Sequence, residues 1–209
     1  MRLTEKYRPK AFAEVVGQDK AVQALANLTP GGRAFWITGK SGMGKTTLAR
    51  ILASQIADGY EVTEIVGRQL TVLGLREIAW RWSYVAMGDK GGYALIVNEA
   101  HGMSKPVVEV FLDILESLPD KTTCVFTTTN DGNDLFEDKM DAGPFASRCI
   151  CVRLTSQGAT KPFAERLRQI AQAEGLDGTP ESEYVKLVNV CHQNFRECLN
   201  RIETGEMQA

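Results

Sequence analysis

Long apolar runs are missing from this sequence. Its apolar stretches fall well short of the roughly 20 residues that a helix needs to span a bilayer. Met1 is followed by Arg2 and mostly polar residues, without the apolar segment that is typical of a secretory signal. We therefore expect a cytoplasmic protein without a membrane partner.

The sequence also lacks a Cys-x-x-Cys pair. Its five cysteines are Cys124, Cys149, Cys151, Cys191 and Cys198. In a chain without a secretory signal, such cysteines are expected to be reduced and buried. A zinc site that includes Cys149, Cys151 or the Cys191-His192 pair is conceivable, but the spacing typical of structural zinc ligands is absent.

An excess of charge of one sign is absent as well. The formal net charge is −2, so no overall basic field indicates a nucleic-acid partner. Only the amino end gathers positive charge, at Arg2, Lys6, Arg8 and Lys10. The apolar content of 44% and the charged content of 24% are typical of globular proteins with a sizeable core.

A glycine-rich loop at residues 39–46 matches the pattern G-x-x-x-x-G-K-[ST]. It follows an apolar stretch typical of a strand and precedes an apolar-periodic stretch typical of a helix, which is the setting that this phosphate-binding motif requires. We expect Lys45 to reach the outer phosphates of a nucleoside triphosphate and the Thr46 hydroxyl to ligate Mg²⁺. The residues predicted to bind the nucleotide here are Gly39, Lys40, Ser41, Gly42, Met43, Gly44, Lys45, Thr46 and Thr47. The alternative is a glycine-rich turn that contains lysine by chance.

A second chemical landmark follows the continuous apolar run at residues 93–97. Such a run is typical of a parallel strand that is covered on both faces, and ligands bind at the carboxyl ends of such strands. Glu99 is therefore the candidate base for the water that attacks the γ-phosphate. Asn98 takes the position of the metal-binding residue, where aspartate is usual, so weaker Mg²⁺ binding is expected. The alternative for Glu99 is a helix cap.

The strand expected at residues 122–128 ends just before Asn130. An amide at this place could orient the attacking water. Next to Asp131 and Gly132, however, Asn130 is also explained by ordinary turn chemistry.

The alternation of apolar patterns predicts an α/β fold. Strands are expected near residues 33–38, 60–66, 93–98, 122–128 and 150–154, and a helix over residues 71–85 lies between the second and third. Three short amphipathic helices follow residue 155. We predict a five-stranded parallel sheet in a nucleotide-binding domain (residues 1–155) and a small helical lid domain (residues 156–209). Trp80 and Trp82 are expected in the core, with base stacking as the alternative.

Taken in order, these motifs resemble AAA+ ATPases of the clamp-loader type, in particular the replication factor C small subunits. The most specific parts of the resemblance are residues 5–9 (Glu-Lys-Tyr-Arg-Pro), 16–18 (Val-Gly-Gln) and 147–149 (Ser-Arg-Cys), and it extends from about residue 4 to residue 203. It implies a P-loop AAA+ core with a helical lid. It also implies that the adenine pocket is formed by Tyr7, Arg8, Val15 and Val16.

The same resemblance assigns further roles. Residues 98–101 look like the Walker B motif, Asn130 looks like sensor 1, and Arg196 looks like sensor 2, which reaches the γ-phosphate from the lid. Arg148 looks like an arginine finger, which acts on ATP bound to the neighbouring subunit and therefore implies an oligomer. The alternative for Arg148 taken alone is a surface salt bridge.

The resemblance implies an ATPase in DNA replication or repair. Its cofactors would be ATP and Mg²⁺, and its partners primed or single-stranded DNA, copies of itself or related AAA+ subunits, and a sliding clamp. Two departures are visible: the family's collar domain does not follow before Ala209, and Asn98 replaces aspartate. A compact, virus-encoded relative could work as a homo-oligomer or with a partner. Lys105 and Arg68 are guesses for DNA contacts.

Two alternatives stay open. The first is a catalytically weak, ATP-gated assembly module, in which Asn98 makes hydrolysis negligible. The second is a DNA motor subunit similar to RuvB, although the winged-helix domain of that protein is not found in this sequence. A small-molecule kinase has no support, because no acceptor site can be identified.

Overall fold

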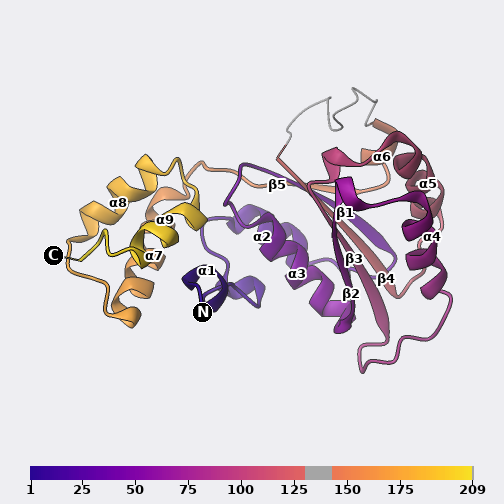
Figure 1. Cartoon of the computed structure of the whole chain (residues 1–209), viewed down its shortest axis with the longest axis horizontal. Coiled ribbons are helices and arrows are strands. Elements are labelled where there is room, and N and C mark those ends of the chain that lie inside the picture. The colour runs from indigo at the N-terminus through magenta and orange to yellow at the C-terminus, as the bar shows by residue number, and fades with distance from the viewer. Residues whose placement is uncertain (130–142, 209) are drawn as a thin grey trace.

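The computed structural model describes residues 1–129 and 143–208. A five-stranded parallel sheet forms the centre of the larger lobe, with the strand order β2-β3-β4-β1-β5 (Figure 1). The strands are β1 (Arg33–Thr38), β2 (Ala57–Val66), β3 (Gly92–Asn98), β4 (Thr122–Thr128) and β5 (Ile150–Arg153). The predicted five-stranded parallel sheet is confirmed.

Helices cover both faces of the sheet, which explains why its strands are apolar without alternation. The helices α2 (Asp19–Ala26) and α3 (Lys45–Ile56) lie over one face. The opposite face carries α4 (Val72–Arg81), α5 (Lys105–Glu116) and α6 (Gly143–Ala146). Successive residues of a strand point to opposite faces, so Phe35 and Ile37 are buried under α3 while Trp36 is buried on the other side.

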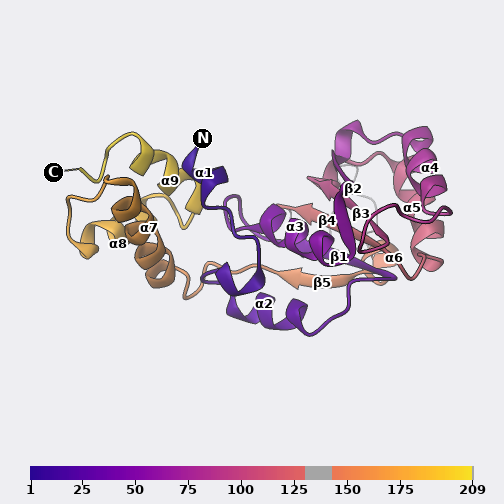
Figure 2. The same ribbon diagram turned by 90° about the horizontal axis from the view of Figure 1, so that it is seen from below.

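Three further helices form a second lobe beside the carboxyl ends of the strands (Figure 1). They are α7 (Thr160–Glu174), α8 (Glu181–Val190) and α9 (Phe195–Glu203), and the short helix α1 (Leu3–Lys6) contacts α9 (Figure 2). The apolar faces of these helices bury Phe163, Leu167, Tyr184 and Leu199. The proposed domain boundary at residue 155 lies in the connection between β5 and α7, and it stays a prediction.

Short 3₁₀ turns complete the larger lobe at residues 12–14, 67–69 and 100–102. In the described part of the chain, no helix has both the length and the apolar character that a membrane span requires.

One helix ends earlier than predicted. The pattern at residues 71–85 predicts a single helix, but α4 ends at Arg81. Buried Glu61 accepts a hydrogen bond from the Met87 backbone N–H (3.2 Å) and pairs with Arg81, which draws the following segment back toward β2. Trp82 is buried as predicted, whereas Trp80 is exposed and packs edge-on against Tyr84.

The amino-terminal segment is joined to the β5–α7 connection by the side chain of Gln18. Its amide donates to the Thr155 carbonyl (3.0 Å) and accepts from the Thr155 N–H (3.1 Å). Gln18 is buried, at 3% exposure, so these two hydrogen bonds are shielded from water. This reciprocal pair gives the Val-Gly-Gln segment a structural role at the junction of the two lobes.

We expect Gln18→Ala to lower the free energy of unfolding by about 2 kcal/mol, because it leaves the N–H and carbonyl of Thr155 without these partners. Urea denaturation followed by circular dichroism measures this loss. The matched control is Gln23→Ala, at an exposed position on α2, which should change stability by less than about 0.5 kcal/mol. Equal losses in the two variants would contradict the role assigned to Gln18.

Candidate active site

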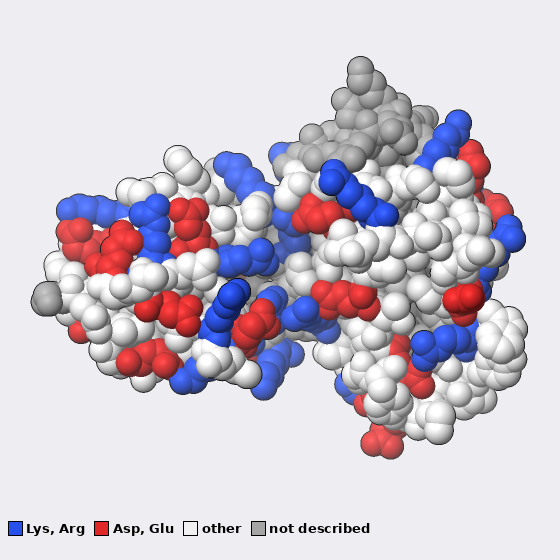
Figure 3. Space-filling view, viewed as in Figure 1, with Lys and Arg blue, Asp and Glu red and all other residues white. Residues whose placement is uncertain are grey.

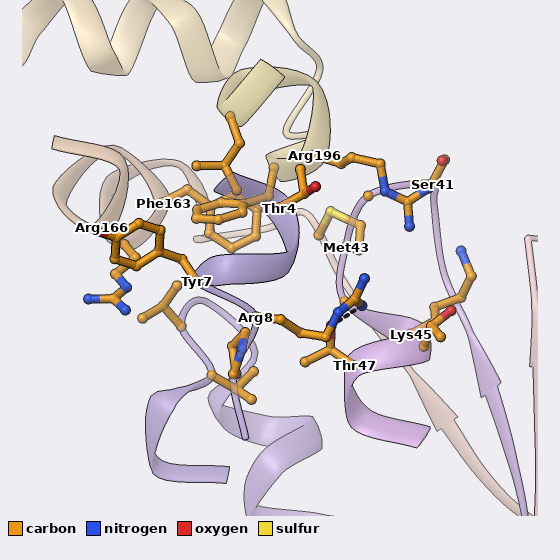
Figure 4. Close-up of a pocket in the computed structure, with 18 of the residues that line it drawn as sticks. Thr4, Tyr7, Arg8, Ser41, Met43, Lys45, Thr47, Phe163, Arg166 and Arg196 are labelled. Atoms are coloured by element: carbon orange, nitrogen blue, oxygen red, sulfur yellow. Dashed lines mark hydrogen bonds between the residues drawn. The ribbon is translucent and has the colours of Figure 1, made fainter. Parts of the chain in front are cut away.

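A pocket opens between the carboxyl edge of the sheet and the helical lobe. Figure 3 shows lysine and arginine side chains gathered along the waist between the two lobes. Three parts of the chain form most of the pocket: the amino-terminal segment, the loop between β1 and α3, and the inner faces of α7 and α9 (Figure 4). Glu99, which follows β3, also lines it. Its lining includes Tyr7, Arg8, Val15, Val16, Ser41, Gly42, Met43, Gly44, Lys45, Thr46, Thr47, Glu99, Phe163, Arg166, Phe195 and Arg196.

The loop after β1 presents an uncapped helix end to this pocket. Gly42 and Gly44 adopt positive φ values of 75° and 98°, which glycine reaches without steric cost. Gly44 is the N-cap residue of α3 and has no side chain with which to satisfy the first N–H groups of the helix. Those N–H groups and the positive end of the helix dipole suit a phosphate.

Lys45 is buried at the start of α3. Its ammonium group donates to the carbonyls of Gly39 (2.7 Å) and Lys40 (3.0 Å). These two bonds hold the ammonium group within the curve of the loop, close to the N-terminus of the helix. Gly39 and Lys40 contribute backbone carbonyls in this way but do not line the pocket themselves.

Oxygen atoms gather beside Thr46. The Thr46 hydroxyl donates to Asn98 Oδ1 (3.0 Å), and the Thr127 hydroxyl donates to the same oxygen (2.9 Å). Hydroxyl and amide oxygens are the hard ligands that Mg²⁺ accepts in proteins. The oxygens of Thr46 and Asn98, the two predicted ligands, are therefore of the kind that fits Mg²⁺, although neither side chain carries a charge.

Glu99 lies at the pocket wall in a strained backbone conformation. Its φ and ψ are both 50°, in the left-handed region that a residue other than glycine rarely adopts. Its side chain is 47% exposed, and Oε2 lies 3.5 Å from His101 Nδ1. His101 Nδ1 is in turn 2.9 Å from the Thr128 hydroxyl at the end of β4. This arrangement places a carboxylate where it can accept a proton from a water molecule in the pocket.

The four residues predicted to surround the base lie together in the structure. Tyr7, Arg8, Val15 and Val16 all line the pocket, and the Arg8 guanidinium donates to the Thr47 hydroxyl (3.3 Å; Figure 4). The Tyr7 hydroxyl donates to Glu174 at the end of α7, and this bond raises the pKa of the phenol above its usual range.

The same segment forms an ion pair with helix α7 of the second lobe. Lys6 forms an ion pair with Glu174 (2.6 Å), and the hydrogen bonds from Lys6 and Tyr7 lower the pKa of that carboxyl. The amino-terminal segment therefore contacts the nucleotide pocket and the end of α7 together.

The lid contributes more residues than the sequence indicated. Arg196, predicted to bind the phosphates, extends toward the loop near Ser41 (Figure 4). Phe163 and Phe195 pack edge-on at 5.0 Å between ring centroids, and Arg166 lines the pocket one helical turn after Phe163. Phe163 was recognisable as an inner-face residue of α7. Its spacing to Arg166 was the available signal that this arginine shares that face.

The lid also touches the phosphate-binding loop directly. Asn194 caps α9 by accepting from the Glu197 N–H (3.2 Å). A Cβ atom placed on Gly42 would lie only 1.8 Å from Asn194 Oδ1. Only glycine therefore fits where the loop meets the lid.

Four of the predicted site residues, Gly39, Lys40, Asn98 and Arg148, do not line this pocket. Arg148 lies outside it, where it donates to the Pro144 carbonyl (2.6 Å) and pairs with Glu116 at the end of α5. Asn130 falls outside the described residues. The predicted DNA contacts are untested: Lys105 is exposed at the start of α5, and Arg68 packs against Gly102.

The cysteines take no part in the site. All five are free thiols, and burial raises the pKa of Cys124, Cys149 and Cys198. Among the described residues, no group of three or more histidine, cysteine or acidic side chains could hold a metal ion.

The fold and the pocket together define a P-loop architecture of the kind that suits a nucleoside triphosphate. Residues 35–149, more than half of the chain, match the AAA family, described as the ATPase family associated with various cellular activities. The chain belongs to this family.

Among curated proteins, the chain is similar to subunits of DNA polymerase III and replication factor C. The DNA polymerase III subunit gamma of Buchnera aphidicola is 29% identical over 96% of this chain and 60% of the relative. A replication factor C small subunit of Methanoregula boonei is 26% identical over 95% of this chain and 61% of the relative. The DNA polymerase III subunit tau/gamma of Haemophilus influenzae is 42% identical, but the match covers 31% of that protein. The predicted resemblance to clamp-loader subunits is confirmed, and the chain spans about 60% of the length of the first two relatives.

Solved structures agree on the fold. The RuvB Holliday junction branch migration motor of Thermotoga maritima superposes with a TM-score of 0.71 over 94% of this chain and 64% of that chain. A RuvB mutant from the same organism gives a TM-score of 0.73. Both are 21% identical to this chain, so the likeness extends to the fold alone.

Proposed function

We propose that this chain is a Mg²⁺-dependent ATPase of the clamp-loader type that acts on DNA in replication or repair. The observation that carries the proposal is the single pocket in which Lys45, Glu99 and Arg196 converge from three parts of the fold. The relatives that cover nearly the whole chain are subunits of DNA polymerase III and replication factor C. Primed or single-stranded DNA and a sliding clamp are the partners that follow from this kinship.

The residues of the pocket have different roles in the proposed hydrolysis. Lys45 and the N-terminus of α3 bind the β- and γ-phosphates, and Glu99 takes a proton from the attacking water. Bound Mg²⁺ would neutralise charge that develops on the phosphates, and Thr46 and Asn98 would hold it. Tyr7, Arg8, Val15 and Val16 surround the base. Asn130 orients the attacking water, as proposed from the sequence.

Two arginines complete the proposed chemistry from different directions. Arg196 reaches the γ-phosphate of its own subunit from the lid. Arg148 lies outside its own pocket, so it is proposed to act on ATP bound to a neighbouring subunit, after leaving Glu116. Because charge on the transferred phosphoryl group needs a positioned cation, hydrolysis would then depend on correct packing of subunits.

A second candidate function rests on Asn98. Its uncharged amide could bind Mg²⁺ too weakly for turnover, and the protein would then be an ATP-gated assembly module. Such a module binds ATP tightly but shows no more hydrolysis than a Glu99→Gln variant. A motor similar to RuvB is a third candidate, supported by the fold alone.

Mixing two inactive variants tests the proposed trans arrangement. Arg148→Ala should lower turnover about a thousandfold while leaving ATP affinity unchanged, because the lost cation acts only in the transition state. Glu99→Gln keeps the arginine but loses the base. When the two variants are mixed, interfaces that combine an intact Glu99 with an intact Arg148 should restore part of the phosphate release.

The matched control is Arg76→Ala, at an exposed position on α4, which should leave turnover unchanged. If Arg148→Ala behaved like this control at every protein concentration, the trans role of Arg148 would be wrong.

A further inference from the structure

The amide of Asn98 is held on both sides by hydrogen bonds. Its oxygen accepts from the Thr46 and Thr127 hydroxyls, and its amino group donates to the carboxylate of Glu64 (2.8 Å) on the neighbouring strand β2. The carboxylate decides the orientation, because an ionised carboxylate can only accept a hydrogen bond. The amino group must therefore face Glu64, and the oxygen must face Thr46.

The pairing of β2 with β3 places Glu64 for this contact. Glu64 lies opposite Ile96 in the parallel register, and Asn98 is two residues further along β3, on the same face. That face is covered by α3, from which Arg50 reaches the same carboxylate with two hydrogen bonds (2.8 and 3.1 Å). The bidentate pair raises the pKa of Arg50 and fixes the plane of the Glu64 carboxylate.

We propose that Glu64 is a positioning residue for the metal site. It turns the Asn98 amide so that an oxygen, rather than an amino group, faces the Mg²⁺ that Thr46 would ligate. An amide presented the other way would direct N–H groups at the cation and would bind no metal. The inference rests on the proposed Mg²⁺-dependent nucleotide binding and deepens it.

An aspartate at position 98, the residue usual at this place in the family, would not need Glu64 in the same way. A carboxylate at position 98 has two equivalent acceptor oxygens and needs no partner to orient it. Placed beside Glu64, it would also bring two negative groups within hydrogen-bond distance, and their repulsion disfavours the doubly charged state. Glu64 should therefore help Mg²⁺ binding through orientation when residue 98 is asparagine and have no such role when residue 98 is aspartate.

The test is a double-mutant cycle in which the affinity for a fluorescent ADP is measured in Mg²⁺ and in EDTA. The ratio of the two affinities is the Mg²⁺ enhancement. In the unaltered background, Glu64→Ala should reduce the Mg²⁺ enhancement of affinity by about tenfold and leave the affinity in EDTA unchanged. With Asn98→Asp present, the same Glu64→Ala change should leave the enhancement unchanged or increase it. Thermal unfolding of each variant confirms that it is folded.

Arg50→Ala is the matched control, because it removes the ion pair but leaves the carboxylate on the Asn98 amide. It should change the Mg²⁺ enhancement by less than about threefold, well below the effect of losing the contact itself. Equal losses from Glu64→Ala in both backgrounds, or no loss in either, would overturn the positioning role. If the unaltered protein bound ADP without any Mg²⁺ enhancement, the metal-dependent function itself would fail along with it.

Discussion

Lys45→Ala should weaken ATP binding by roughly a hundredfold or more and abolish measurable hydrolysis. The Lys45 ammonium lies within the curve of the phosphate-binding loop, bonded to the carbonyls of Gly39 and Lys40. When a triphosphate enters, this buried cation can exchange carbonyl partners for phosphate oxygens. In a partly desolvated site, losing such a cation is worth a factor of about 10² to 10³.

Fluorescent-nucleotide titration and phosphate release together measure this effect. Lys40→Ala is the control, because Lys40 belongs to the same loop but has an exposed side chain outside the pocket. It should bind ATP within about threefold of the unaltered protein, since an exposed charge contributes little. Similar losses in the two variants would mean that general positive charge, rather than the placed ammonium of Lys45, attracts the nucleotide.

Glu99→Gln should separate binding from hydrolysis. Glutamine has nearly the shape of glutamate but cannot accept the proton of the attacking water, so turnover should fall by about 10² to 10⁴. ATP affinity should be retained, because Glu99 lies at the pocket wall rather than in the loop that binds the phosphates.

Single-turnover hydrolysis with protein in excess measures the chemical step directly. Glu109→Gln, at an exposed position on α5, is the matched control and should leave the rate unchanged. An unaltered rate in Glu99→Gln would assign the base to another group and would leave the strained backbone of Glu99 without a catalytic explanation.

Much of this site could be predicted because its signals are local in the chain. The loop pattern at residues 39–46 contains its own turn, cation and helix start. The apolar run of β3 is unambiguous, and the carboxyl ends of parallel strands meet at one edge, so Glu99 could be assigned to the pocket before the structure was known.

Other features depend on contacts between distant segments, and no local pattern carries them. The bond between Glu64 and Asn98 requires the register of β2 against β3, which an irregularity between Ala57 and Val62 displaces. The helix α4 ends at Arg81 because buried Glu61, on strand β2, pairs with Arg81 and accepts a hydrogen bond from the Met87 N–H. The position of Arg166 in the pocket depends on how the helical lobe packs against the loop, which no local pattern shows.

Hydrolysis of ATP at interfaces between subunits is the property on which the proposed function depends. The most direct measurement is phosphate release per subunit against protein concentration, with and without primed DNA, beside the Glu99→Gln variant. We predict a rate that rises steeply with concentration, increases with DNA and disappears in the variant. A rate per subunit that is independent of concentration, or that never exceeds the variant, would contradict the account.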